Sequence, residues 1–331
     1  MKSRSESVSM RDVIRVNAAS IDLTSSHAIT FGYVNELARV GRLISGRYRL
    51  VRPLPEPLAG KASGNLWLSE SPWLGATVMV EFLDPAIAED AGLADAFEWE
   101  ARAAAAVTSP FVNRVLDYGI EASTPYLVTQ LPCGESLAAR LARQDLLRPA
   151  ELERTFREVA HAVEEMHALG LLHRDLRSDR IFLGRPSFRV VGGDAAEREA
   201  SSLSFGISKL MNDTLELVRT MARRAVTPAD VPRYVSPEQV LGTSAPDARS
   251  DLWSLAVIAF ECMTGELPFV AATMSERLVQ ICTGEARVPS QLRPVPPGFD
   301  AWFARGVQKS PDDRWSSALQ MADALSAILG G

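Results

Sequence analysis

The segment that most limits how this chain can fold is SDLWSLAVIAFECMTG, residues 250–265, which is apolar on nearly every side of a helix. A helix of that kind has no face for water and must lie in the middle of a folded body. No run of about 18 apolar residues occurs in the chain, so a membrane-spanning helix is not expected. The sequence therefore predicts a helical body built around this segment.

The chain before this helix changes character twice, after a tail that ends at about residue 42. Between residues 47 and 130, short runs rich in β-branched and aromatic residues predict strands: RYRLV, NLWLS, ATVMVEFL and TPYLVTQ. One helix is expected among them, at about 91–107. After LPCG, helical spacing dominates, as in ELERTFREVAHAVEEMHALG, which Gly170 ends. This order predicts an α+β fold of two lobes, a small one rich in strands and a larger helical one.

These changes divide the chain into three expected parts. Residues 1–42 form a loosely ordered N-terminal tail, rich in Ser, Asn and Thr, with a short helix near 31–40. Its start, MKSRSESVSM, lacks the apolar stretch of a signal peptide. Residues 43–131 form the small lobe (N-lobe), and residues 132–331 form the large lobe (C-lobe).

Composition excludes several functions. The chain has 41 acidic and 35 basic residues, a net charge of −6, and no Lys/Arg-rich block, which argues against a nucleic-acid partner. Cysteines 133, 262 and 282 form no CxxC pair, so neither a disulfide nor a zinc site is expected. Three of the four histidines lie six residues apart, which does not stack them on one helical face. These features are typical of a reduced cytoplasmic protein without membrane insertion.

Five motifs follow one another in a fixed order: HRDLRSDR at 173–180, FGISKL at 205–210, YVSPEQ at 234–239, SDLWSLAVIAFECMTGELPF at 250–269 and SPDDRW at 310–315. With these motifs, the chain from about Gly46 to Gly331 resembles bacterial Ser/Thr protein kinases of the eukaryotic-like (Hanks) type. The resemblance implies a two-lobed protein-kinase-like fold, with a small β-rich N-lobe and a larger α-helical C-lobe. It does not by itself imply activity, because function depends on the site.

The resemblance also implies roles for individual residues. In the family, a strand Lys held by a helix Glu grips two phosphates, an Asp and an Asn hold magnesium, and another Asp accepts the substrate proton. Asp175 keeps the proton-accepting position, and Glu100 keeps the helix Glu. Glu81, in VMVE, stands where the Lys is expected. Two carboxylates would then face each other and repel.

Both metal-ligand positions depart from the family pattern. Arg180 stands where the Asn is expected, and a guanidinium has only donors, so it cannot ligate magnesium. Ser204 stands where the Asp is expected, in an alignment that places an insertion at about 192–202. An alternative alignment places this triplet at 192–194, and its first residue is not Asp either. No metal is therefore expected.

The positions that would hold the nucleotide are degenerate as well. Gly64 is the one clean match to the Gly-rich loop, and a plain hairpin turn explains it better. Lys61 could replace the missing strand Lys, but only in an active enzyme. Pro132, at the hinge, lacks the N–H that adenine would need, a loss of about 1–3 kcal/mol. Pro132 could also simply stiffen the hinge.

Positions that support the fold match the family better. Glu238 and Arg314 resemble a buried ion pair, and Asp251 resembles the helix Asp that caps the catalytic loop. Removing one partner of such a pair costs about 3–5 kcal/mol. By contrast, the Thr that bonds the catalytic Asp in the family is Val231 here.

The sequence thus favours a catalytically impaired kinase-like domain, a pseudokinase, that acts as a signalling or scaffolding module. The resemblance implies another kinase or its substrate as the protein partner, and no cofactor is expected. One alternative is an active atypical Ser/Thr kinase that uses ATP, magnesium and Asp175 as the base. A second is a metal-independent nucleotide sensor, against which Pro132 and Glu81 argue.

Arg180 is central to one further hypothesis. It would take over the electrostatic role of the metal by pairing with Asp175 or Glu81 within about 3.2 Å. The alternative is a solvated Arg180, with Glu81 turned outward.

Overall fold

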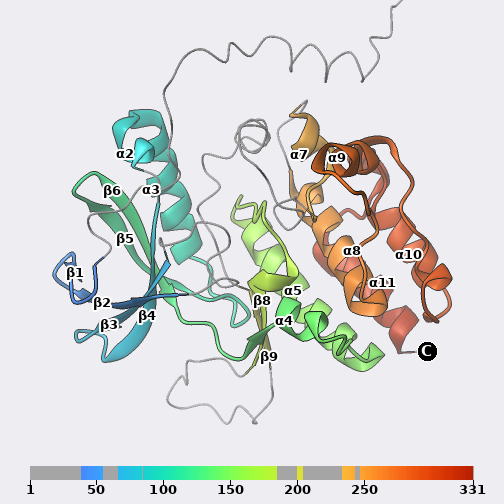
Figure 1. Cartoon of the computed structure of the whole chain (residues 1–331), viewed down its shortest axis with the longest axis horizontal. Coiled ribbons are helices and arrows are strands. Elements are labelled where there is room, and N and C mark those ends of the chain that lie inside the picture. Colours follow the sequence, from blue (N-terminus) through green and yellow to red (C-terminus); the bar gives the residue numbers. More distant parts are fainter. Residues whose placement is uncertain are drawn as a thin grey trace, which may run out of the picture. The chain divides into compact units, whose positions relative to one another are not determined.

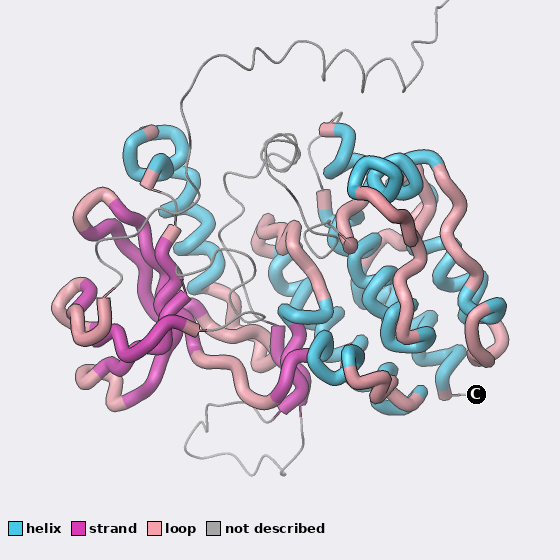
Figure 2. Tube along the Cα trace, viewed as in Figure 1, coloured by secondary structure: helices cyan, strands magenta, loops and turns pink. Residues whose placement is uncertain are grey.

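A computed structural model of the chain describes residues 39–54, 66–83, 85–184, 200–203, 233–242 and 247–330. Residues 36–331 form one compact unit, and the remaining segment, 1–35, lies outside the described residues. Strands dominate the first part of this unit and helices the second (Figures 1 and 2). The two-lobed α+β fold expected from the sequence is confirmed.

The N-lobe is an antiparallel sheet in the order β1-β2-β3-β4-β6-β5. Its strands are β1 (Leu43–Ile44), β2 (Tyr48–Pro53), β3 (Leu66–Ser71), β4 (Ala76–Phe82), β5 (Val115–Glu121) and β6 (Thr124–Gln130). The sheet curls, because contacts join its two edges: the Tyr48 hydroxyl donates to Asp117 at 2.7 Å, and Arg42 pairs with Glu121 at 3.9 Å. One face buries a cluster that includes Tyr48, Val80 and Val128.

Two helices, α2 (Ala86–Glu89) and α3 (Ala91–Ala105), accompany the sheet. Helix α3 begins where the Asp90 carboxylate accepts the Leu93 N–H at 3.0 Å, a standard N-cap. Its buried face includes Phe97, which packs edge-on against Tyr118 of β5. The helix is thereby fixed against the sheet, and Glu100 with it.

The C-lobe contains a small sheet and a set of helices. The sheet, in the order β7-β8-β9, consists of β7 (Glu135–Ser136), β8 (Ile181–Gly184) and β9 (Ala200–Leu203). The longer helices are α5 (Pro149–Ala168), α8 (Ala248–Thr264), α9 (Met274–Thr283), α10 (Phe299–Gly306) and α11 (Ala318–Leu329). The shorter ones are α4 (Leu137–Ala142), η1 (Ser178–Arg180), α7 (Pro237–Leu241), η4 (Pro289–Gln291) and η5 (Pro311–Asp313). Within the described ranges, no helix is long and apolar enough to cross a bilayer.

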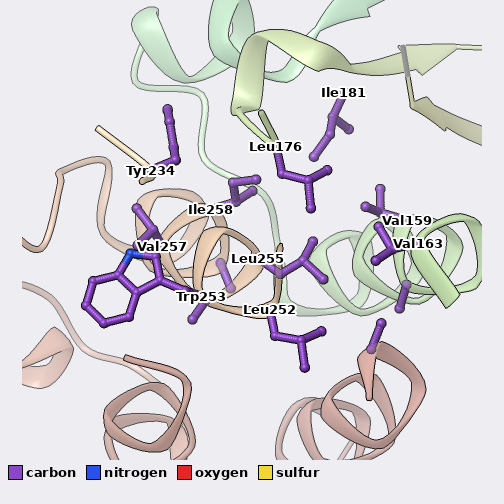
Figure 3. Packing of buried hydrophobic residues seen from close by; sticks show 14 of the residues in the cluster. Val159, Val163, Leu176, Ile181, Tyr234, Leu252, Trp253, Leu255, Val257 and Ile258 are labelled. Carbon is purple, nitrogen blue, oxygen red and sulfur yellow. The ribbon is translucent and has the colours of Figure 1, made fainter. Parts of the chain in front are cut away.

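Helix α8 is the centre of the C-lobe, as its all-round apolar sequence predicts. Leu252, Trp253 and Leu255 are at most 1% exposed. Figure 3 shows Leu252 and Leu255 on the side toward Val159 and Val163 of α5. The helix ends at Gly265, whose positive φ of 72° suits glycine.

The hinge between the lobes depends on a second glycine. Gly134 has a φ of +86°, and a Cβ there would lie 1.9 Å from the Leu183 carbonyl oxygen. Only glycine permits this approach of the hinge to β8. The hinge backbone next to Pro132 is therefore fixed by packing against the C-lobe.

Some expectations need correction. Strand β5 was not expected, because VLDYGIE mixes polar and apolar residues without a clean alternation. The tail does not reach residue 42, since Gly41 donates to the Leu50 carbonyl and Leu50 to that of Arg42. The short helix expected near 31–40 lies mostly outside the described residues. Finally, residues 200–202 belong to strand β9, so the insertion expected at 192–202 ends earlier.

The β5–β6 turn offers a test of backbone strain. Ala122 and Ser123 have φ values of +47° and +60°, a conformation that favours Asn and Gly. Replacing them with Asn-Gly should raise the free energy of unfolding by about 1 kcal/mol, measured by urea denaturation. Ala106→Asn, at a right-handed φ of −82°, is the control. An equal effect of both changes, or a loss at the turn, would contradict the strain argument.

Candidate active site

The carboxylate of Asp251 on α8 accepts hydrogen bonds from the backbone of the HRDLRSDR loop. Asp251 accepts the backbone N–H groups of His173 at 2.9 Å and Arg174 at 2.8 Å, and it contacts the His167 ring at 2.8 Å. It is only 1% exposed. The cap expected from the sequence is therefore present, and it fixes the loop backbone next to Asp175.

Two guanidinium groups flank the side chain of Asp175. Arg177 Nε lies 3.6 Å from one carboxylate oxygen, and Arg180 Nη2 lies 3.8 Å from the other. Arg177 Nε also contacts Asp179, at 3.0 Å. Burial lowers the pKa of Arg177, but Asp175 and Asp179 outweigh it and leave that pKa raised. Arg177 therefore stays charged beside Asp175.

Arg180 is buried, with only 9% of its side chain exposed. It belongs to η1, the short turn that joins the loop to β8. The 3.8 Å contact with Asp175 is an ion pair and not a hydrogen bond, so the close pair expected within about 3.2 Å is not formed. The alternative, an Arg180 in solvent, is wrong. Among the residues that the structure describes, its Nε is buried without a hydrogen-bond partner, so its charge is matched chiefly by Asp175 at 3.8 Å.

The residues described here do not suit magnesium. A divalent cation needs oxygen ligands, and a buried guanidinium at the Asn position supplies only donors and a repelling charge. Among the described residues, no group of three or more His, Cys, Asp or Glu side chains gathers. Ser204, the other altered position, lies outside the described residues.

Glu81 shares one face of β4 with Met79. Its register partners are Leu66 on β3 and Leu127 on β6. Cross-strand partners share a face, and so do residues two apart on a strand, which places Glu81 beside Met79. Met79 packs with Leu54 and Leu66. Glu81 is half-buried. The strand thus places a carboxylate beside an apolar patch.

Glu100 contacts a cation that the sequence reasoning did not consider. Arg174 Nη1 lies 3.4 Å from Glu100 Oε1 and joins α3 to the loop. Burial raises the pKa of Glu100, and Arg174 lowers it only in part. The sequence offered one signal for this pair: when the strand Lys is lost, the helix Glu needs another cation.

The backbone of Arg174 is strained, with a φ of +60°. Asp251 binds its N–H, and the Gln239 side-chain amide donates to its carbonyl at 3.1 Å. The neighbours therefore over-determine this conformation, as is common at functional sites. The position of the Arg174 side chain follows from two anchors in the C-lobe.

The hinge and the nucleotide-covering loop are described only in part. Pro132 follows β6 and is half-buried, in the segment that leads to Gly134. Gly64, Lys61 and Val231 lie outside the described residues. Strand β9 pairs with β8 in the register Ile181↔Leu203. Because β9 ends at residue 203, immediately before Ser204-Phe205-Gly206, the pairing favours the alignment that the sequence analysis preferred.

The ion pair expected between Glu238 and Arg314 is present. Arg314 Nη1 and Nη2 donate to the two carboxylate oxygens, each at 2.8 Å. The remaining N–H groups donate to the carbonyls of Arg249, Gln308 and Lys309, so all five donors are used. Burial acts to raise the pKa of Glu238, but hydrogen bonds from Arg314 and Ser250 keep it lowered.

A second buried network ties the loop to the segment that precedes α7. The Tyr234 hydroxyl donates to Glu261 at 2.7 Å and lies 2.8 Å from the Ser178 hydroxyl. Burial raises the pKa of Tyr234 and, despite the hydrogen bond from Tyr234, that of Glu261. Burial thus shifts both groups toward their neutral forms. Sequence reasoning missed this network, because its members are far apart in the chain.

Substitutions of Arg314 and Asp251, which hold the C-lobe together, should destabilise the fold more than a substitution of Asp175 in the loop. Arg314→Ala leaves Glu238 buried without its cation and should cost about 3–5 kcal/mol of unfolding free energy. Asp251→Ala leaves the N–H groups of His173 and Arg174 without their acceptor and should cost a similar amount of unfolding free energy. Asp175→Asn, which keeps the side-chain shape, should cost clearly less in the same urea titration. Equal losses for all three would show that this division is wrong.

The opposite pKa shifts of two glutamates predict opposite pH dependences. The raised pKa of Glu100 means that its contribution to stability is present at acid pH and is lost as pH rises through that pKa. Glu100→Gln should therefore be most favourable, relative to the parent, at about pH 8, and lose that advantage towards about pH 4. Glu238, with its lowered pKa, stabilises at neutral pH and loses its contribution on acidification.

Glu238→Gln is thus the matched control. It should be most harmful at about pH 8 and less so near pH 4. Urea denaturation of the parent and both variants across this range measures the two differences. Curves of the same slope for both variants would contradict the assigned shifts.

Comparison with known proteins gives one consistent result. A family model described as a protein kinase domain matches residues 87–322. Serine/threonine-protein kinase Pkn1 of Myxococcus xanthus is 31% identical over 295 residues, which cover 86% of this chain and 38% of that protein. PknA of Mycobacterium tuberculosis is 30% identical over 302 residues, which cover 88% of this chain and 64% of that protein. The chain therefore spans less than two thirds of each.

A solved structure shows the same fold. The crystal structure of the Mycobacterium tuberculosis PknI kinase domain superimposes with a TM-score of 0.65, at 23% identity. The match covers 88% of this chain and 99% of that domain. The likeness includes both the curled sheet and the helical lobe.

Proposed function

This chain belongs to the protein kinase family, and we propose that it is a catalytically impaired member, a pseudokinase, that acts through protein–protein contacts. The observation that carries the proposal is the buried Arg180, which stands at a metal-ligand position 3.8 Å from Asp175. Kinase catalysis depends on metal ions that bridge the phosphates and neutralise developing charge. A buried guanidinium repels a metal and supplies no oxygen ligand.

The surroundings of Asp175 support the same conclusion. A general base must be within reach of the hydroxyl that it deprotonates. The oxygens of Asp175 already face Arg177 at 3.6 Å and Arg180 at 3.8 Å. An incoming hydroxyl would compete with two cations for them. The retained Asp is therefore proposed to balance charge within the loop.

The ion partner of Glu100 also supports the pseudokinase proposal. In an active family member the helix Glu would hold a Lys that grips phosphate. Here the corresponding Glu100 pairs with Arg174, and Glu81 stands at the Lys position. The nucleotide phosphates would meet a carboxylate there. Pro132 removes a further contact, the N–H to adenine.

Contacts that maintain the shape are intact. Arg314 keeps all five hydrogen bonds, and Asp251 keeps the loop. A module that works by shape needs these contacts and does not need the phosphate-handling groups. We propose another kinase, or the substrate of one, as its partner.

Two other functions remain as proposals of lower rank. An active atypical Ser/Thr kinase is favoured by Asp175, in its family position on a loop that Asp251 holds, and it would need Lys61 for phosphate. A metal-independent nucleotide sensor is favoured by the cations Arg177 and Arg180. Glu81 and Pro132 weigh against both.

We expect no phosphate transfer to the protein itself or to generic substrates. The test incubates the purified chain with labelled ATP and either magnesium or manganese, with Asp175→Ala as the control. Label that is incorporated by the parent and abolished in the control would refute the pseudokinase. A thermal shift with ATP separates the rest: a metal-dependent shift indicates a kinase, a metal-independent shift a sensor, and no shift a scaffold.

A further inference from the structure

One end of the curled sheet exposes large apolar side chains. Trp73 is 74% exposed and Leu74 40%, in the turn between β3 and β4. Val40 is 71% exposed, Leu43 41% and Ile120 50%. Val40 and Leu43 precede the β1–β2 turn, and Ile120 lies near the β5–β6 turn. The β1–β2 and β3–β4 turns lie at the same end of the sheet (Figure 1). The β5–β6 turn lies at the other end of β6, and the curl of the sheet brings its Glu121 to Ser45 and Arg42, on either side of β1.

Side-chain and backbone contacts join these turns into one surface. The Arg47 guanidinium lies 5.7 Å from the centre of the Trp73 ring and pairs with Asp117 of β5 at 3.3 Å. The Ser45 N–H donates to Glu121, the residue after Ile120. We call this the sheet-end surface, and its exposed members are Arg39, Val40, Arg42, Leu43, Arg47, Arg49, Trp73, Leu74 and Ile120.

The charged residues of this surface are layered. Arg42 and Arg47 expose 40% and 54% of their side chains, whereas their partners Glu121 and Asp117 expose 26% and 24%. Asp117 also accepts the Tyr48 hydroxyl, which holds it close to the sheet. The outer layer therefore presents guanidinium and apolar groups, with two of the acids beneath. Glu70, opposite Arg49, is an exposed acid of this end.

We propose that the sheet-end surface binds an anionic lipid surface. The amphipathic ring of Trp favours the headgroup layer of a bilayer, and arginines attract anionic lipids. The Arg–carboxylate pairs here are exposed and weak, so the arginines can exchange these partners for lipid phosphates. In a chain with a net charge of −6, attraction to an anionic surface must come from a local patch such as this one.

The shape of this end favours a bilayer over a peptide. Trp73 and Leu74 occupy a tight turn between paired strands, closed by Gly75 with a φ of +61°. A turn tip can enter a headgroup layer as it stands, whereas an extended peptide needs a groove or a free strand edge. The edge strand β1 has only two residues and offers little to pair with. The contact is peripheral and involves no membrane-spanning segment.

The test is co-sedimentation of the full chain with vesicles. Vesicles of phosphatidylcholine mixed with phosphatidylglycerol should retain the chain at low salt, and pure phosphatidylcholine should not. The double variant Trp73→Ser, Leu74→Ser should bind at least about fivefold more weakly, and so should Arg42→Gln with Arg47→Gln. Trp99→Ser is the matched control, because Trp99 is 54% exposed but lies on α3, outside this surface.

Three results would overturn the proposal. The first is failure to bind the mixed vesicles at low salt by a chain that melts normally. The second is an equal loss of binding in Trp99→Ser. The third is a different occupant: poly-glutamate bound more tightly than vesicles indicates an acidic peptide, and a dimer that Trp73→Ser dissociates indicates a second copy. Phosphate transfer is not measured, so the result is independent of the pseudokinase proposal.

Discussion

The geometry of the candidate site depends on the buried carboxylate of Asp251. It accepts two consecutive N–H groups of the loop, and this fixes Arg174 in a left-handed conformation and sets the direction of Asp175. Asp251 can do this because α8 is buried on all sides and cannot rotate or slide. The buried apolar helix α8 thus fixes the position of the charged HRDLRSDR loop. Arg174 in turn forms an ion pair with Glu100, which links the loop to α3.

The charges of the site form a system that is matched without a metal. Asp175 and Asp179 face Arg177 and Arg180, and Glu100 faces Arg174. A buried charge is costly unless an opposite charge lies near it. A half-buried Glu100 therefore needs a cation nearby, and Arg174 of the loop supplies it. The replacements are physically linked, because each leaves a charge that another must offset.

Much of this was predictable from the sequence, for reasons that differ between elements. Helix α8 and strands β2, β3, β4 and β6 carry strong periodic or apolar patterns, and their existence was predicted correctly. Strand β5 has a mixed pattern and acquires its structure from pairing with β6, a long-range effect that local propensity does not contain. The Glu238–Arg314 pair was predictable because both residues lie in recognisable motifs.

The partners of the site residues were harder to predict than the residues themselves. Motifs placed Asp175, Glu100 and Arg180, but a pairing depends on side-chain directions set by tertiary structure. Arg174 could have faced several acids, and its strained backbone turns it to Glu100. Arg180 lies at the end of the η1 turn, which brings it only to 3.8 Å from Asp175.

The looseness of that contact has a physical consequence. A tight bidentate pair would use the donors of Arg180 on Asp175. The observed contact instead leaves Nε buried and without a hydrogen bond among the described residues. An unsatisfied buried donor costs about 1–3 kcal/mol, a cost that the surrounding fold must offset. The stability available for this comes from the supports that are intact, above all the five hydrogen bonds of Arg314. A strained site can therefore persist in a well-supported lobe.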